Sequence, residues 1–175
     1  MPSFPLLGSR VGIRRPTAED RDELLILTKS SRDLHNPWVV PPLTPEQFDV
    51  YLQSRQNPGD DGFFICDAQS AHIVGVVNLN CIVRGFFQSA YLGYYVAAPF
   101  ARQGFMTEGL KLVARFAFTD MKLHRLEANI QPENIASIAL ARKCGFRREG
   151  FSPKYLKVQG EWRDHERWAL LAADS

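Results

Sequence analysis

The chain has 175 residues, of which 45% are hydrophobic and 23% are charged, and its formal net charge is +2 at pH 7. The length fits one domain over residues 1–175 with a substantial core. So small a net charge argues against direct binding to nucleic acid or to a membrane surface. No apolar run approaches the roughly 18–20 residues that span a bilayer. Cys66, Cys81 and Cys144 are scattered and predict reduced thiols in a cytoplasmic protein, with no zinc site.

The first half of the chain predicts a strand, two helices and a strand hairpin. Val11–Arg15 is a short strand, and Thr17 with Asp20 resembles a capping box for the first helix. A proline-rich irregular stretch covers residues 36–42. Thr44, followed by proline, then caps a second helix. The hairpin strands are predicted at Phe63–Asp67 and Ile73–Val83.

In the second half, strands and helices alternate around one loop. The predicted elements are a strand at Ser89–Val96, a helix at Thr107–Asp120, a strand at Arg125–Ile130, a helix at Asn134–Cys144 and strands at Arg147–Leu156 and Trp162–Leu170. This order predicts an α+β (mixed α/β) fold. Its mostly antiparallel twisted sheet would have six or seven strands and helices on both faces. One parallel βαβ crossover would link Ser89–Val96 to Arg125–Ile130.

The loop between Val96 and Thr107 has the chemistry of an anion site. A strand ends, a glycine-containing loop follows, and a helix begins, so free N–H groups and the positive end of the helix dipole meet at one point. Gly104 would let a phosphate approach the backbone closely. Such loops also serve ordinary connections, so the loop alone is a weak signal.

Three stretches of the chain resemble the GCN5-related N-acetyltransferases (GNAT). They are the loop Ala101–Met106, the helix from Asn134 that ends in Cys144-Gly145-Phe146, and the tail Tyr155–His165. Within that superfamily, the chain is similar to the RimJ and RimL type of ribosomal-protein-alanine N-acetyltransferases. The resemblance implies one acetyltransferase domain that uses acetyl-CoA and no metal.

The resemblance also implies a cofactor site. Met106 stands where the superfamily has a small residue, and in this it is similar to the RimJ and RimL branch. Val96, eight residues before Gly104, corresponds to the strand residue that pairs with the pantetheine arm where two strands splay. The implied cofactor-binding residues are Tyr95, Val96, Arg102, Gln103, Gly104, Phe105, Met106, Thr107, Asn134 and Ser137.

Acetyl transfer needs a neutral amine, an oxyanion stabiliser and a proton for the leaving thiolate. Many relatives supply that proton from a tyrosine seven residues after the asparagine, but here the position is Ala141. The resemblance implies Ser137 as the catalytic residue, either a proton donor or a hydrogen-bond partner of the thiol; the alternative is a serine on the helix surface. The backbone N–H near Val96 is the implied oxyanion donor.

The general base is left open by the sequence. Lys154 stands where some relatives place a carboxylate, and Glu161 and Asp164 are alternatives more typical of surface carboxylates. His165 is interpreted as structural. An α-amine with a pKa of about 7.7–8.0 is partly neutral at pH 7 and needs only a weak base.

Three functions are therefore compared: acetylation of a protein N-terminus such as that of a ribosomal protein, acetylation of a small amine (amino sugar, polyamine or amino acid), and acyl-CoA binding without turnover. The chain could act as a monomer or a homodimer. Five aromatic residues could either line a cleft for the acceptor or pack in the core. Those in the turn Arg84–Phe87 are expected to be exposed and to contact another molecule. These aromatic residues are Trp38, Tyr51, Phe86, Phe87 and Tyr155.

Overall fold

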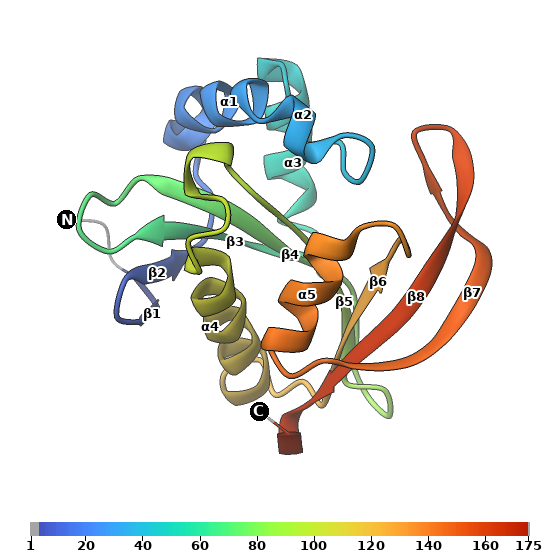
Figure 1. Cartoon of the computed structure of the whole chain (residues 1–175). Coiled ribbons are helices and arrows are strands. Elements are labelled where there is room, and N and C mark those ends of the chain that lie inside the picture. The colour runs from blue at the N-terminus through green and yellow to red at the C-terminus, as the bar shows by residue number, and fades with distance from the viewer. Residues whose placement is uncertain (1–3, 175) are drawn as a thin grey trace.

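The computed structural model describes residues 4–174. One eight-stranded sheet runs through it in the spatial order β1-β2-β3-β4-β5-β6-β8-β7 (Figure 1). The strands are β1 Leu6–Leu7, β2 Val11–Arg14, β3 Asp61–Asp67, β4 Ile73–Val83, β5 Ser89–Val96, β6 Arg125–Ile130, β7 Arg147–Val158 and β8 Glu161–Leu171. The helices are α1 Arg21–Ser30, α2 Arg32–His35, α3 Pro45–Ser54, α4 Phe105–Thr119 and α5 Ile135–Lys143, and short 3₁₀ turns lie at Ala18–Asp20, Ala98–Phe100 and Ala172–Asp174.

This architecture confirms the predicted α+β fold. The strands at Ser89–Val96 and Arg125–Ile130 have the predicted bounds and form the parallel pair. The sheet has one strand more than the sequence predicted, the two-residue β1, which exists through its pairing of Leu6 with Ile13 and of Leu7 with Gly12. The four-residue α2 lies just before the stretch predicted to be irregular and was not expected.

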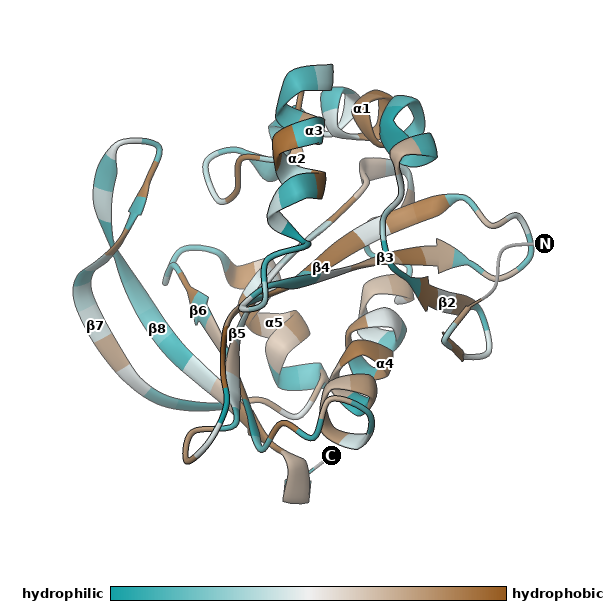
Figure 2. Cartoon of the chain, turned by 180° about the vertical axis from the view of Figure 1, so that it is seen from behind, coloured by the Kyte–Doolittle hydropathy of each residue, from teal (hydrophilic) through white to brown (hydrophobic). Residues whose placement is uncertain are grey.

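Two hydrophobic clusters lie on opposite faces of the sheet. Helices α4 and α5 cover one face, where Leu110, Val113 and Ala117 of α4 pack in the larger cluster with no exposed surface. Helices α1 and α3 cover the β2–β5 part of the other face, where Leu24 and Phe48 belong to the smaller cluster. Figure 2 shows α1–α3 above that part, while β6, β7 and β8 carry no helix on this side.

The β7–β8 hairpin curves away from the rest of the sheet (Figure 1). A register shift between Ser152 and Leu156 interrupts the pairing of β7 with β8. Such irregularities bend and twist a two-stranded ribbon. The tip of the hairpin returns to the segment after α2, because the Gln159 side-chain amide donates to the Asn36 side chain at 3.2 Å and to the Pro37 carbonyl at 3.3 Å.

Cys66, Cys81 and Cys144 are all free thiols. Burial raises the pKa of both Cys66 and Cys144 to about 11, so these two thiols stay protonated near neutral pH. Between residues 4 and 174, no helix is long and apolar enough to cross a membrane, and no group of three or more His, Cys, Asp or Glu side chains could hold a metal ion.

Candidate active site

The parallel strands β5 and β6 part before either of them ends. Their pairing runs from Ser89 with Arg125 to Leu92 with Ala128. Beyond that point β5 continues to Val96 paired only with β4, while β6 continues to Ile130 paired with β8. The expected splay is therefore present. Because Ala97 donates its N–H to Val74 of β4, and successive peptide groups alternate in direction, the Val96 N–H points to the side facing the gap.

The loop after β5 leads directly into the N-terminus of α4. Gly104 is the N-cap residue and has a φ of 82°, a left-handed conformation that glycine adopts without strain. The N–H groups in the first turn of the 15-residue helix have no acceptor within the helix, so they are available to an anion. The helix begins at Phe105, two residues before the predicted start.

The predicted loop residues face in different directions. Arg102 is exposed and has a φ of 61°, and the Gln103 amide folds back to donate to the Pro99 carbonyl at 2.7 Å. Phe105 packs edge-on against Phe100. Met106 is buried, and its sulfur would lie 2.5 Å from a Cβ placed on Gly75 of β4. The position can therefore hold a long side chain where many relatives have a small residue, because that side chain enters the core.

Helix α5 brings Ser137 to β5. Asn134 caps this helix as predicted: its Oδ1 accepts a hydrogen bond from the Ser137 N–H at 3.1 Å. The Ser137 hydroxyl donates to the Tyr94 hydroxyl at 2.8 Å, and Tyr94 in turn donates to the Ser137 carbonyl at 3.3 Å. Burial raises the pKa of Tyr94 to about 12, so both hydroxyls are protonated at neutral pH. Ser137 is thus held by a half-buried partner and is not an isolated surface serine.

Tyr94 is a site residue that the sequence reasoning missed. Side chains alternate along a strand, and Tyr94 and Val96 pack with the cluster under α4 and α5. That alternation is the signal that could have found it. Tyr95, which was named instead, points to the opposite face, where its ring packs with the cluster of α1 and α3. A role for Tyr95 in cofactor binding stays a prediction, and only the backbone of this residue could take part in it.

His35 at the end of α2 was also missed. It is 5% exposed, and its Nε2 donates to the Val96 carbonyl at 2.8 Å. Its ring meets the Tyr95 ring edge-on, with 5.1 Å between the centroids. The other ring nitrogen, Nδ1, is buried and has no hydrogen-bond partner in the described part of the chain. Burial lowers the pKa of His35, although the Val96 hydrogen bond acts in the opposite direction, so the ring is neutral at pH 7.

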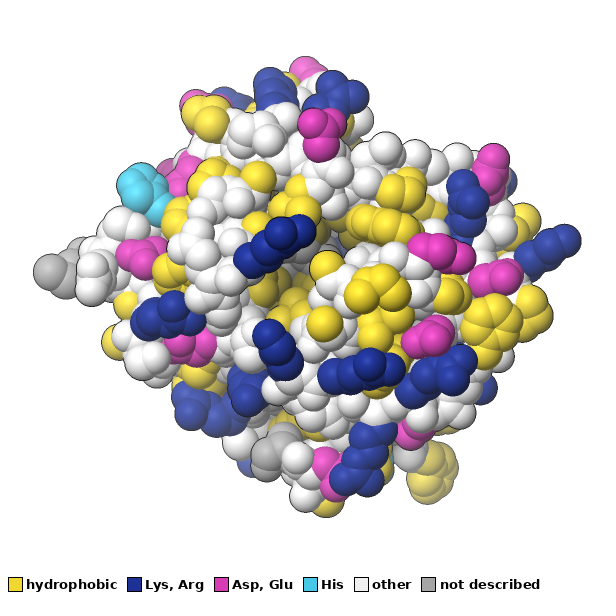
Figure 3. Space-filling view, in the orientation of Figure 1, with side chains coloured by type: hydrophobic (Ala, Val, Ile, Leu, Met, Phe, Trp, Pro, Cys, Tyr) yellow, Lys and Arg dark blue, Asp and Glu magenta, His cyan; other side chains and the backbone are white. Residues whose placement is uncertain are grey.

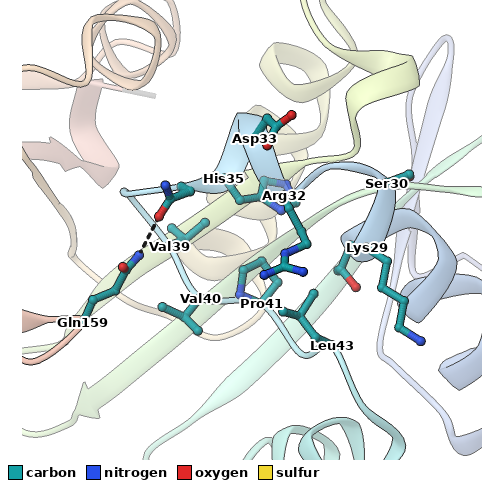
Figure 4. Close-up of a pocket in the computed structure, with 12 residues that line it drawn as sticks. Lys29, Ser30, Arg32, Asp33, His35, Val39, Val40, Pro41, Leu43 and Gln159 are labelled. Carbon is teal, nitrogen blue, oxygen red and sulfur yellow. Dashed lines mark hydrogen bonds between the residues drawn. The ribbon is translucent and has the colours of Figure 1, made fainter.

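A cavity of about 660 Å³ lies beside His35, between the segment from α1 to α3 and the tip of the β7–β8 hairpin (Figure 4). Its walls carry two basic side chains, Lys29 and Arg32, and one acidic side chain, Asp33. Gln159 closes one side through its contact with Asn36. His35 both lines this cavity and bonds to Val96, so this side chain lies between the cavity and the end of β5 that borders the strand gap.

The candidate bases from the tail have other partners. Glu161 forms an ion pair with Arg163 at 2.7 Å, and Asp164 accepts a hydrogen bond from the Lys154 N–H at 2.8 Å. His165 is buried, with Nδ1 2.9 Å from the Arg163 carbonyl. These contacts agree with a structural interpretation of all three side chains.

The candidate acceptor aromatics divide between packed and exposed positions. The Tyr51 hydroxyl donates to Asn78 at 3.0 Å, and the Tyr155 ring lies edge-on to a histidine ring. Trp38 is half-buried. Phe86 and Phe87 are exposed at the turn between β4 and β5. That turn lies at the opposite end of β5 from Val96, so these two rings are remote from the cavity.

The family model described as "Acetyltransferase (GNAT) domain" matches residues 10–147. The chain is 30% identical over 177 residues to "Probable N-acetyltransferase YjcK" of Bacillus subtilis, covering 97% of this chain and 98% of that protein. The chain therefore belongs to the GNAT acetyltransferase family.

The chain is also similar to two proteins of the kind that the sequence resemblance suggested. The chain is 37% identical over 112 residues to the ribosomal protein uS5-alanine N-acetyltransferase of Escherichia coli, an alignment covering 64% of this chain and 58% of that enzyme. The structure of Mycobacterium smegmatis RimJ in complex with CoA-disulfide superposes with a TM-score of 0.85 at 27% identity, covering 93% of this chain and 82% of that one.

The residues present fit acetyl-CoA. The left-handed Gly104 and the N–H groups in the first turn of α4 form an anion cradle that a pyrophosphate would fit, and a Cβ at Gly104 would lie 3.0 Å from the Arg10 guanidinium. The gap after Leu92 leaves strand N–H and C=O groups for an extended amide-bearing arm. Exposed basic residues lie on α4 and α5, namely Lys111, Arg115, Arg142 and Lys143. Figure 3 shows several Lys and Arg side chains on the face of the molecule seen in Figure 1.

Proposed function

We propose that this chain transfers an acetyl group from acetyl-CoA to a protein N-terminal α-amine, as a ribosomal-protein-alanine N-acetyltransferase does. The observation that supports it most is the strand gap at Val96, which opens between the anion cradle of α4 and the Ser137–Tyr94 pair. We place the reaction in the cytoplasm, in keeping with the three free thiols. A monomer and a homodimer are both compatible with this proposal.

Bound acetyl-CoA would supply the activated acetyl group as a thioester. The amine nitrogen would attack the carbonyl carbon directly, so that a C–N bond forms, the C–S bond breaks and the amine loses one proton. The Val96 N–H would donate to the oxyanion, as a preorganised backbone dipole can. The loop from Arg102 to Thr107 would hold the phosphates, and Asn134 would fix the first turn of α5 beside the pantetheine arm.

Ser137 would act as a hydrogen-bond donor to the leaving thiolate. A thiol has a pKa of about 8.5, and Tyr94 has a pKa of about 12, so full transfer of the Tyr94 proton to the thiolate is unfavourable. Because a serine hydroxyl has one hydrogen, Ser137 would turn it from the Tyr94 oxygen to the thiolate, and Tyr94 would then donate its own hydrogen to Ser137 Oγ. A hydrogen bond donated in this way stabilises the developing charge. The proton that the thiol finally carries can come from the attacking amine.

The lining of the cavity beside His35 favours a peptide over a polyamine. The lining residues include Lys29, Arg32 and one acidic residue, Asp33, so the lining that the structure describes lacks the cluster of acidic side chains that would attract an acceptor with several positive charges. A peptide N-terminus carries one titratable amine and needs only a weak base. About 660 Å³ holds the first residues of a peptide, and the cavity lies within the usual size range of ligand sites.

The test is thiol release from acetyl-CoA with a panel of acceptors. It includes peptides beginning with alanine, the same peptides with a blocked N-terminus, spermidine, an amino sugar and free amino acids. We expect release only with the free N-terminal peptides, and mass spectrometry should place the acetyl group on the α-nitrogen. Release with a small amine alone would overturn the choice of acceptor. CoA binding without release from any acceptor would leave only an acyl-CoA-binding module.

A second test addresses the anion cradle. A Gly104→Glu variant would place a carboxylate in a left-handed position at the helix N-terminus, where it would repel phosphate. We expect CoA affinity to fall by at least about tenfold on grounds of charge alone. Unchanged CoA binding would remove the phosphate role of this loop.

A further inference from the structure

We propose that Arg10, in the turn between β1 and β2, is a pyrophosphate-binding residue of the acetyl-CoA site. The inference rests on the proposed function. It concerns a residue far from the loop in sequence, which neither the loop pattern nor the resemblance to acetyltransferases had indicated.

Three contacts fix the guanidinium of Arg10 at the entrance to α4. Nη1 donates to the Gln103 carbonyl at 3.1 Å, the guanidinium carbon lies 4.7 Å from the centre of the Phe105 ring, and Nε lies 3.5 Å from the Glu108 carboxylate. A guanidinium held in this way brings its donors to the positive end of the helix dipole and offsets the negative charge of Glu108 there. Its placement is therefore set before any ligand arrives.

The remaining nitrogen, Nη2, reaches the space in front of Gly104. A Cβ built on Gly104 would lie 3.0 Å from Nη2, closer than ordinary packing allows. Glycine at this position thus leaves room for the guanidinium as well as for the left-handed backbone. An Arg guanidinium has five N–H groups in a planar fork suited to phosphate oxygens, and the side chain is 48% exposed, so donors remain accessible to a ligand.

The position of Glu108 is a second observation that explains why a basic residue lies at the N-terminus of α4. Its carboxylate lies in the first turn of α4, where an unpaired negative charge would compete with phosphate. Partial burial would raise the pKa of Glu108, but hydrogen bonds from the Arg10 N–H and the Ser9 hydroxyl outweigh it and hold the pKa below its ordinary value. The carboxylate is thus turned toward the β1–β2 turn and paired with Arg10.

A purely structural clamp between this turn and α4 is the competing explanation. The two can be separated by isothermal titration calorimetry with three ligands. They are CoA, dephospho-CoA, which lacks the 3′-phosphate, and pantetheine, which lacks the pyrophosphate and the 3′-phosphoadenosine joined to it. We expect Arg10→Gln to weaken CoA and dephospho-CoA by the same factor, about ten- to hundredfold. Pantetheine binding and the melting temperature of the unliganded chain should be unchanged.

Arg10→Lys keeps the charge without the planar fork and should give an intermediate loss. Arg21→Gln removes one exposed positive charge from α1, where Arg21 is paired with its neighbour Asp22, and should leave all three affinities unchanged. Equal affinity of Arg10→Gln and wild type for CoA would overturn the proposal. So would a loss confined to CoA, which would assign Arg10 to the 3′-phosphate, or an equal loss for all three ligands, which would make it a clamp. Failure of the wild-type chain to bind CoA would instead overturn the proposed function.

Discussion

The Nε2 atom of His35 lies 2.8 Å from the carbonyl oxygen of Val96, and this hydrogen bond joins two residues that are 61 positions apart in the sequence. One of them lines the cavity proposed for the acceptor, and the other ends the strand that borders the gap proposed for the donor. The two halves of the proposed site therefore share one buried hydrogen bond.

The neutral state of His35 predicts a pH dependence of stability. Burial lowers its pKa in the folded chain below the ordinary value of 6.5, so the unfolded chain binds the proton more tightly. Stability should be unaffected above about pH 6.5 and should fall as the pH drops from there through the folded pKa. Thermal unfolding midpoints measured from pH 7.5 to 5 should show this decline, and His35→Gln should reduce it.

The exposed His72 offers a matched control for that experiment. His72→Gln should keep the wild-type decline, because it leaves the buried contact between His35 and Val96 intact. If the decline is the same in His35→Gln as in wild type, another group causes it.

The pairing of Ser137 with Tyr94 predicts a graded loss of turnover. Ser137→Ala should lower kcat by about ten- to hundredfold, the value of one hydrogen bond to a charged group, without changing CoA affinity. Tyr94→Phe keeps the ring and leaves the serine hydroxyl free to rotate, so the loss should be smaller. Steady-state kinetics with a free N-terminal peptide would measure both. Wild-type kcat in Ser137→Ala would remove this serine from the chemistry.

The contact of the β7–β8 hairpin tip predicts a change in acceptor binding. Gln159→Ala removes two hydrogen bonds that close one side of the cavity, so KM for a peptide acceptor should rise severalfold, by about 1 kcal/mol. The dissociation constant for CoA should not change. Lys157→Ala, on the same hairpin, is the control. A lower KM in Gln159→Ala would mean that the tip blocks the acceptor.

The close packing of α4 on the sheet predicts that alanine substitutions at two glycines differ in their effect on stability. A Cβ on Gly109 would lie 2.5 Å from a side-chain carbon of Ile65, whereas a Cβ on Gly59 would have no heavy atom within 4 Å. Gly109→Ala should cost about 1–3 kcal/mol through overpacking and lower the melting temperature by several degrees. Gly59→Ala should change it little. Calorimetry on both variants decides, and equal melting temperatures would show that α4 can shift without cost.

Regular elements with a clear pattern could be predicted from the sequence. The apolar run before the loop set the bounds of β5, and Asn134 fixed the start of α5 through its cap. β1 and α2 could not be predicted, because segments of two and four residues are too short to show a periodicity.

The same distinction applies to the site. Gly104 and Ser137 carry local signals, and the alternation of side chains along β5 contains the information that places Tyr94 beside the serine. His35 and Arg10 carry none. Their positions follow from the packing of α2 and of the β1–β2 turn against segments more than sixty residues away.

Because β5 and β6 part before either strand ends, the described sheet lacks hydrogen bonds between them beyond Leu92 and Ala128. In the part of the chain that the structure describes, four residue pairs between β5 and β6 join the strands β1–β5 of the sheet to the strands β6, β8 and β7. A donor arm lying in the gap would act as a removable strand that locks the two halves together. By mass action, a ligand at a hundred times its dissociation constant adds about 2.7 kcal/mol of stability. The rigidity of the sheet would then rise and fall with the supply of its own cosubstrate.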